Sequence, residues 1–292
     1  MKTILAVITD LLDSEKFIKY NVNLAEDMKF NLHLVYVQNP ALYTLSTGTA
    51  ASSSQPMDNE VDTVRLETER KNALKSVKEQ VNKFQNDLPE SISIEVSVDA
   101  GTVTMILNQY ISDNKAEMAV LKGQDENDFW LADSTNIRVI QKINCPGWII
   151  PSECNYQPFK KIIYATDYNE ADIQTLKKLA ALTKRSSPQI TALHITESGN
   201  FKEKAMESGF REMLIKNSDY DRISVESIID EKKGDDIGKL INEYAIDNEA
   251  DLLVLLKENQ GFIDKIFKPG TTRKVTREAL KKAGIPVLVF KE

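Results

Sequence analysis

The 292-residue chain has few of the residues on which many catalytic and metal sites depend. It contains two histidines, two cysteines, two tryptophans and 11 glycines. Cys145 and Cys154 match no disulfide framework and no metal-ligand spacing. Each half of the chain has one histidine and no cysteine near it in the sequence, which gives no support to a metal site or a catalytic triad. We therefore expect no metal ligands and no catalytic residues, and the chain is predicted not to be an enzyme.

Two further absences exclude other classes of protein. A membrane-spanning helix needs about 20 consecutive apolar residues, and no run in this chain approaches that length. The run from Ile4 to Ile8 is also too short for a signal peptide and suits a first strand. The net charge of −7 is opposite in sign to the surface that phosphate backbones require. These features predict a cytoplasmic protein that has neither a membrane nor nucleic acid as a partner.

The chain does contain an internal repeat. NQYISDNKAEMAVL, starting at Asn108, is identical at seven of 14 positions to NEYAIDNEADLLVL, starting at Asn242. KTILAVITD, which ends at Asp10, has a counterpart in KKIIYATD, which ends at Asp167. Each half closes with an apolar segment that contains a proline, NCPGWIIP in the first and AGIPVLVFKE in the second. The sequence therefore predicts two copies of one structural unit.

The two copies define the expected domains, at residues 1–151 and 158–292. Both lengths are ordinary for a domain, and the segment between them, PSECNYQPF, contains two prolines and no periodicity. The first copy also has a small, polar insert between Thr44 and Glu60. Because this insert lacks apolar anchors, we expect it to be the most protease-sensitive part of the chain.

Within each copy, apolar runs alternate with amphipathic segments. Short apolar runs bounded by turn residues are typical of strands that are buried on both faces. Between these runs, two segments of the first copy are predicted to be helices. One is the long segment at 61–84. In the other, four apolar side chains are spaced to share one helix face: Phe17, Tyr20, Leu24 and Met28. Alternating strands and helices imply a parallel sheet with right-handed crossovers. We expect an α/β fold with five parallel strands in each copy and helices on both faces of each sheet.

The order of these motifs resembles the universal stress protein family. A first strand followed by Asp, the segment GDDIGKLI, the acid-led strand ADLLVLL and the closing strand IPVLVF occur in the family's order, and the resemblance covers both copies. It implies a Rossmann-like fold of the adenine nucleotide alpha hydrolase type. Family members commonly pair through their last strands, so we expect the two copies to form a pseudo-twofold pair through Trp148–Ile150 and Val287–Phe290. Whether the chain also forms a homodimer stays open.

One branch of that family binds ATP through the motif G-x2-G-x9-G-[ST] after the fourth strand. Its glycines let the backbone approach the phosphates, and the next helix N-terminus holds the anion. The first copy has only Gly123 in this segment, and four carboxylates there would repel a triphosphate: Asp125, Glu126, Asp128 and Asp133. We therefore expect no nucleotide in the first copy.

The second copy retains the end of the motif. Gly270 and Thr271 match its final G-[ST], whereas Lys257 and Gln260 stand where the two earlier glycines belong. The segment is basic and can begin a helix, which favours an anion, although a capped helix with a basic solvent-facing side gives the same pattern. ATP-binding members also place an Asp near the nucleotide at the end of the first strand. The candidate nucleotide or anion site comprises Asp167, Lys268, Gly270, Thr271, Thr272 and Arg273.

The two histidines of the chain occupy similar places in the two copies. His33 and His194 each follow a leucine in the expected second strand of their copy, so we interpret them as equivalent structural residues.

The favoured function is a non-catalytic stress-response protein with degenerate nucleotide loops and no cofactor, acting through an unknown protein partner or a small anionic ligand. The alternative is an ATP-binding protein, with slow hydrolysis as a further option, that uses the second domain.

Overall fold

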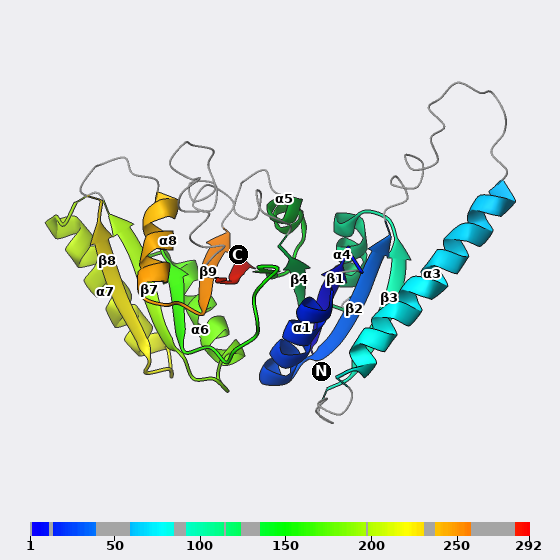
Figure 1. The fold of residues 1–292 in the computed structure, drawn as a ribbon. Coiled ribbons are helices and arrows are strands. Elements are labelled where there is room, and N and C mark those ends of the chain that lie inside the picture. Colours follow the sequence, from blue (N-terminus) through cyan, green and yellow to red (C-terminus); the bar gives the residue numbers. More distant parts are fainter. Residues whose placement is uncertain are drawn as a thin grey trace, which may run out of the picture. The chain divides into compact units, whose positions relative to one another are not determined.

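The structure is a computed structural model, and it describes residues 2–11, 14–38, 59–84, 92–113, 115–123, 135–196, 198–230, 237–257 and 284–292. The chain divides into two compact units, Met1–Leu121 and Lys122–Glu292 (Figure 1). The compact units and the sequence copies therefore divide at different points, and the domain limits at 151 and 158 stay a prediction about the repeat. No helix of the described part has the length and apolar character needed to cross a membrane.

The first unit is a parallel α/β sheet in the spatial order β3-β2-β1-β4. Its strands are β1 (Thr3–Ile8), β2 (Asn31–Gln38), β3 (Ile94–Ala100) and β4 (Met118–Lys122). Its described helices are α1 (Glu15–Met28), α3 (Asn59–Asn82) and α4 (Val103–Ser112). α1 packs beside α3 (Figure 1). The connection from β3 to β4 runs back in the opposite direction, which places α4 on the other face of the sheet.

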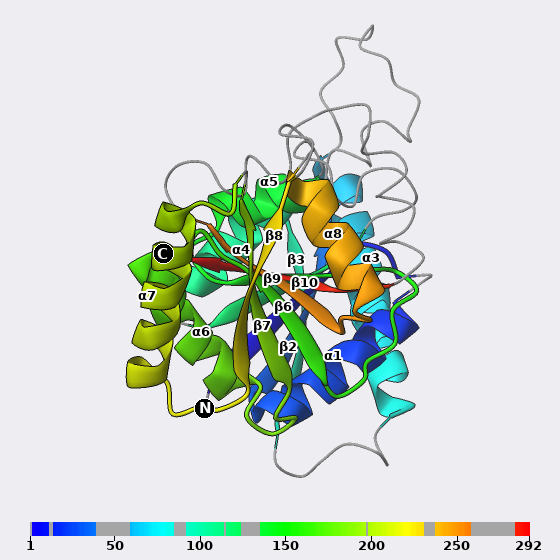
Figure 2. The same ribbon diagram turned by 90° about the vertical axis from the view of Figure 1, so that its left-hand side faces the viewer.

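The second unit contains a six-stranded sheet in the order β5-β10-β9-β6-β7-β8. Its strands are β5 (Gly147–Ile150), β6 (Lys161–Ala165), β7 (Gln189–Thr196), β8 (Ile223–Ile229), β9 (Leu252–Lys257) and β10 (Val287–Lys291). Its described helices are α5 (Thr135–Lys142), α6 (Glu170–Leu182), α7 (Phe201–Asn217) and α8 (Ile237–Asp247). Figure 2 shows α6 and α7 on one face of these strands and α8 on the other. The predicted α/β class with helices on both faces is confirmed.

The closing strands of the two sequence copies are neighbours in the second unit. β5 pairs antiparallel with β10, with Trp148 opposite Leu288 and Ile149 opposite Val287. On its other side, β10 pairs parallel with β9. The two closing strands therefore lie next to each other, as expected, and each covers an edge of the other. The pseudo-twofold arrangement of two whole copies stays a prediction.

The predicted apolar face of the first helix is confirmed. The four side chains that were expected to share one face of α1 are all buried: Phe17, Tyr20, Leu24 and Met28. Burial of such side chains stabilises a helix by about 1.5–3 kcal/mol per large side chain. The second predicted helix, at 61–84, corresponds to α3. Since α3 begins at Asn59, the last two residues of the expected insert are helical, and the rest of Thr44–Glu60 lies outside the described residues.

Two features of the internal repeat have a direct structural reason. The acid that leads β9, Asp251, accepts hydrogen bonds from the backbone N–H groups of Lys160 and Lys161 at 2.7 and 2.8 Å, which fixes the start of β6 beside β9. The repeated tyrosines have matching roles. Tyr110 donates to Asp99 of β3 at 2.8 Å, and Tyr244 donates to Glu226 of β8 at 2.5 Å. Each tyrosine thereby ties its helix, α4 in the first copy and α8 in the second, to the outermost strand of that copy.

Candidate functional site at the carboxyl ends of β6 and β7

Of the predicted nucleotide or anion site, Asp167 is the one residue within the described part of the chain, and it lies in the turn that follows β6. The residues of this turn are Thr166, Asp167 and Tyr168. The backbone N–H of Tyr168 donates to Thr166 Oγ1 at 2.9 Å, and Tyr168 has a φ of 61°. A non-glycine residue in this left-handed region carries backbone strain and persists only where its surroundings hold it. The turn therefore depends on side-chain contacts that fix Tyr168.

A buried carboxylate anchors this turn to α6. Asp172 is 3% exposed and accepts hydrogen bonds from Tyr164 Oη and Thr166 Oγ1, both at 2.6 Å. It also accepts from the backbone N–H of Asn169 at 3.0 Å, which satisfies a donor at the start of the helix. Charge-assisted hydrogen bonds of this kind are about twice as strong as neutral ones. Asp172 thus ties the end of β6, the turn and the first turn of α6 together.

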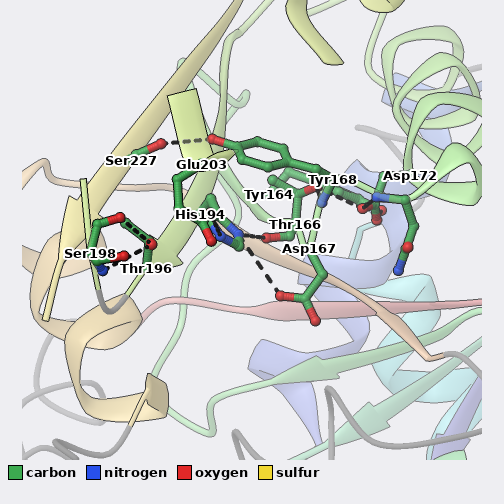
Figure 3. Close-up of polar contacts among 11 residues, drawn as sticks. Tyr164, Thr166, Asp167, Tyr168, Asp172, His194, Thr196, Ser198, Glu203 and Ser227 are labelled. Carbon is green, nitrogen blue, oxygen red and sulfur yellow. Dashed lines mark hydrogen bonds and ion pairs between the residues drawn. The ribbon is translucent and has the colours of Figure 1, made fainter. Parts of the chain in front are cut away.

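His194 lies beside the turn on β7, and its side chain is 12% exposed. Its Nδ1 lies 2.8 Å from the carbonyl oxygen of Thr166. A carbonyl can only accept, so Nδ1 carries the proton, and Nε2 faces the carboxylate of Glu203 at 3.6 Å (Figure 3). The carboxylate of Asp167 lies 3.8 Å from Nδ1. Two carboxylates therefore approach one imidazole at the carboxyl ends of β6 and β7.

The Tyr168 side chain covers this imidazole. Its ring centroid lies 4.3 Å from that of His194 and 5.0 Å from that of Phe210. Its hydroxyl lies 2.7 Å from Ser227 Oγ, and Ser227 donates its single proton to Glu207 at 2.8 Å. Tyr168 Oη is therefore the donor to Ser227. Burial raises the pKa of Tyr168, so this hydroxyl stays protonated at neutral pH.

The position of Glu203 follows from the local sequence. Asn200 caps α7 and accepts a hydrogen bond from the backbone N–H of Glu203 at 3.0 Å, so Glu203 lies in the first turn. A carboxylate is favourable there because the helix N-terminus carries partial positive charge. α7 begins at the carboxyl end of β7, and this places Glu203 next to His194. Glu203 was not among the residues predicted from the sequence, because its contact with His194 depends on the packing of α7.

The side chains of this site are acidic and are joined by hydrogen bonds and close charged contacts. Among the described residues, three carboxylates belong to it: Asp167, Glu203 and Glu207. Such a cluster attracts cations and hydrogen-bond donors and repels phosphates. Within the described residues, no group of three or more His, Cys, Asp and Glu side chains has the arrangement to hold a metal ion. The ring of Tyr168 already occupies one face of His194, so that face is closed to a ligand.

Of the predicted nucleotide or anion site, only Asp167 lies among the described residues. Lys268, Gly270, Thr271, Thr272 and Arg273 lie outside them, as do the acidic residues of the first loop. Lys257, which replaces the first glycine of the motif, is the last residue of β9. The candidate site therefore stays a prediction, and Asp167 has a partner in His194 that the sequence did not indicate.

The expected equivalence of the two histidines is wrong. His33 is the third residue of the eight-residue β2, whereas His194 is the sixth residue of the eight-residue β7. His33 Nε2 lies 2.8 Å from Ser97 Oγ, and its ring meets Tyr110 edge-on at 4.8 Å. His33 is therefore a buried structural residue near the amino end of its strand. His194 lies at the carboxyl end, where α/β proteins place their ligands.

Comparison with known proteins bears on the fold of the whole chain and on the family of residues 158–291. The model of the universal stress protein family matches residues 158–291. These residues therefore form a universal stress protein domain, and the amino-terminal half of the chain has the same type of fold. A comparison with curated proteins gives no match.

Several solved structures resemble the chain over its whole length. A universal stress protein from Archaeoglobus fulgidus DSM 4304 has a TM-score of 0.60 at 15% identity, covering 99% of this chain and 96% of that one. A putative universal stress protein from Pseudomonas aeruginosa UCBPP-PA14 has a TM-score of 0.55 at 15% identity, covering 100% and 93%. The cytoplasmic domain of a prokaryotic cation chloride cotransporter has a TM-score of 0.55 at 9% identity, covering 99% and 94%. At these identities the likeness shows the fold alone.

Proposed function

We propose that the chain is a non-catalytic, cytoplasmic stress-response protein that acts by binding and whose nucleotide loops are degenerate. The observation that carries this proposal is the arrangement around His194. Tyr168 stacks on the imidazole at 4.3 Å, and the carboxylates of Asp167 and Glu203 lie within 3.8 Å of its ring nitrogens. The chain's own side chains thus take the stacking and charged positions at the carboxyl ends of β6 and β7.

Each of these contacts counts against a nucleotide at that place. A base would need an aromatic or apolar face on which to stack, and Tyr168 uses one face of His194 for itself. A triphosphate would meet carboxylates of its own sign. The strained backbone of Tyr168 is held by its contacts with Phe210 and Ser227, so moving the ring aside would break both. The proposed ligand is therefore a protein partner or a small anion held away from Asp167.

The alternative function is ATP binding by the second domain, with slow hydrolysis as a further option. It is supported by the family of residues 158–291 and by the sequence of the basic segment at 268–273. In that case Lys268, Thr271 and Arg273 would hold the phosphates, and Asp167 would contact another part of the nucleotide.

Isothermal titration of the full-length protein with Mg-ATP separates the two functions. We expect no binding in the micromolar range and no phosphate release above that of the buffer. Native mass spectrometry of the same preparation should show no retained nucleotide. Micromolar binding that is lost in Lys268→Ala, Thr271→Ala and Arg273→Ala would establish the alternative instead. The matched control is Lys216→Ala, an exposed lysine on α7 that pairs with Glu212.

A further inference from the structure

Two lysines of the second unit meet at one backbone carbonyl. Lys257 ends β9, Lys291 ends β10, and the two are direct partners in the parallel register. Partners in adjacent strands project their side chains from the same face of the sheet. Both ammonium groups reach the carbonyl oxygen of Gln141, at 2.9 and 3.1 Å. Their nitrogens are therefore at most 6.0 Å apart, which is the sum of those two distances.

The position of Gln141 explains why the pair persists. Gln141 lies in the last turn of α5, where backbone carbonyls lack helical partners and favour positive charge. Like charges opposite each other on neighbouring strands are otherwise destabilising. In the described part of the chain, neither ammonium group pairs with a carboxylate. Two half-buried amines thus share a single acceptor, and their repulsion is relieved when one of them is neutral.

We propose that Lys291 is a nucleophilic amine that accepts an acyl group from small acyl phosphates, while the charge of Lys257 attracts the phosphate of the donor. The geometry supplies both requirements of this chemistry. A lysine next to another cation becomes a nucleophile because its neutral form is favoured. The second cation lies within reach of the same incoming molecule, which selects an anionic donor over a neutral one.

The protonation of Lys291 agrees with this role. Burial, followed by the positive charge of Lys257, lowers the pKa of Lys291 to about 8. Among the described residues, three neighbouring elements face its amine: β9 contributes Lys257, the turn after α5 contributes Cys145, and α5 contributes the Gln141 carbonyl. Cys145 acts in the opposite direction and raises the pKa, but its effect is smaller.

The proposed step is a simple acyl transfer. The neutral amine of Lys291 attacks the carbonyl carbon of the acyl phosphate, and a C–N bond forms while the C–O bond to phosphate breaks. Inorganic phosphate leaves, and the proton of the resulting ammonium passes to solvent. No oxidant or reductant takes part. The product is an uncharged amide, which removes the repulsion with Lys257 and retains one N–H that can donate to Gln141.

The test is the rate of acetylation at each lysine when the full-length protein reacts with acetyl phosphate. At pH 8 a lysine with a pKa of about 8 holds about a hundredfold more neutral amine than one near 10.4, and its lower basicity reduces this to a rate advantage of about tenfold. Peptide mass spectrometry should therefore find Lys291 modified about tenfold faster than the exposed Lys216 and Lys75. Its rate should level off above pH 8, whereas theirs should still rise at pH 9.

Two controls make the proposal falsifiable. Lys257→Met should slow Lys291 several-fold at pH 8 and move its pH profile upward, while Lys216→Met should leave both unchanged. N-acetylimidazole, a neutral donor, should show a smaller preference for Lys291 than acetyl phosphate does. A wild-type rate equal to that of exposed lysines would overturn the proposal and leave Lys291 as a helix cap. An equal preference for both donors, or no effect of Lys257→Met, would overturn the role assigned to Lys257.

Discussion

The turn after the first strand is anchored differently in the two copies. In the second copy, Asp172 accepts hydrogen bonds from Tyr164, Thr166 and Asn169, all within eight residues of it. In the first copy the buried residue is Ser14, whose Oγ lies 3.0 Å from the Leu11 carbonyl and 2.7 Å from Gln80 Oε1. One turn is held by a local carboxylate, and the other by a side chain of α3 that lies 66 residues further along the chain.

This difference shows that the same sequence motif can be held by different side-chain hydrogen bonds in two copies of one unit. Both copies carry Thr-Asp after the first strand. In the second copy the buried carboxylate that anchors the turn comes from α6, the next helix in the chain. In the first copy the anchor comes from α3, since Gln80 also donates to the Leu11 carbonyl at 3.2 Å. We therefore expect the two turns to respond differently to substitution.

Asp172→Ala should have the largest effect. It removes the acceptor of three hydrogen bonds and leaves the hydroxyls of Tyr164 and Thr166 buried without that partner. We expect the free energy of unfolding of the second unit to fall by about 3 kcal/mol. Guanidinium denaturation, with hydrogen exchange of the α6 amides, measures this. The exposed Asp219→Ala should change stability by less than about 0.5 kcal/mol. A loss below about 1 kcal/mol for Asp172→Ala would show that the carboxylate does not hold the turn.

Ser14→Ala should have a smaller effect, because it removes neutral hydrogen bonds. We expect a loss of about 1 kcal/mol in the first unit, together with faster hydrogen exchange in the first turn of α1. Gln80→Ala should give a similar loss, and the double variant should lose less than the sum because the two residues share one network. Strict additivity would indicate that the contact between Ser14 and Gln80 carries little energy. Ser112→Ala, at the exposed end of α4, is the matched control.

The smallest expected effect concerns pH. Burial lowers the pKa of His33, although the charges of Glu95 and Asp99 oppose the shift. The unfolded chain takes up this proton near pH 6.5 and the folded chain at a lower pH, so protons favour the unfolded state in between. Stability should be unaffected above about pH 7.5 and should fall, by less than about 1 kcal/mol, as the pH drops below 6.5.

His33→Gln isolates that contribution. The carboxylates titrate in both proteins, so the difference between their stability curves from pH 7.5 to pH 5 belongs to His33. The variant should have the flatter curve. Parallel curves would show that the pKa of His33 is the same in the folded and the unfolded chain.

Much of the fold could be predicted from local patterns. Apolar runs located the strands, and the 3.6-residue spacing of side chains such as Phe17 and Leu24 identified the buried face of α1. The internal repeat also aligns Tyr110 with Tyr244, and in the structure each donates to a carboxylate on the outermost strand of its copy. These predictions succeeded because strand burial and helix periodicity depend on neighbouring residues in the sequence.

The candidate site was less predictable, because its contacts join separate elements. Both histidines occur as Leu-His followed by an aliphatic residue, but His33 lies near the amino end of its strand and His194 near the carboxyl end. Asn169 and Asp172 have the spacing of a helix-capping pair, a signal that could have located Asp172. Nothing local indicates that Tyr168 covers His194. The pairing of Lys257 with Lys291 required the order of β9 and β10 in the sheet.

The pairing of β5 with β10 also has a consequence for the order of events during synthesis. At typical elongation rates, the ribosome completes β5 about 140 residues, or roughly 7–30 s, before β10 is available. During that interval β5 is complete but lacks its antiparallel partner. A nascent chain that stalls between β5 and β10 would expose the β5 edge to strands of other molecules. Synthesis of β10 is therefore the step that protects this edge.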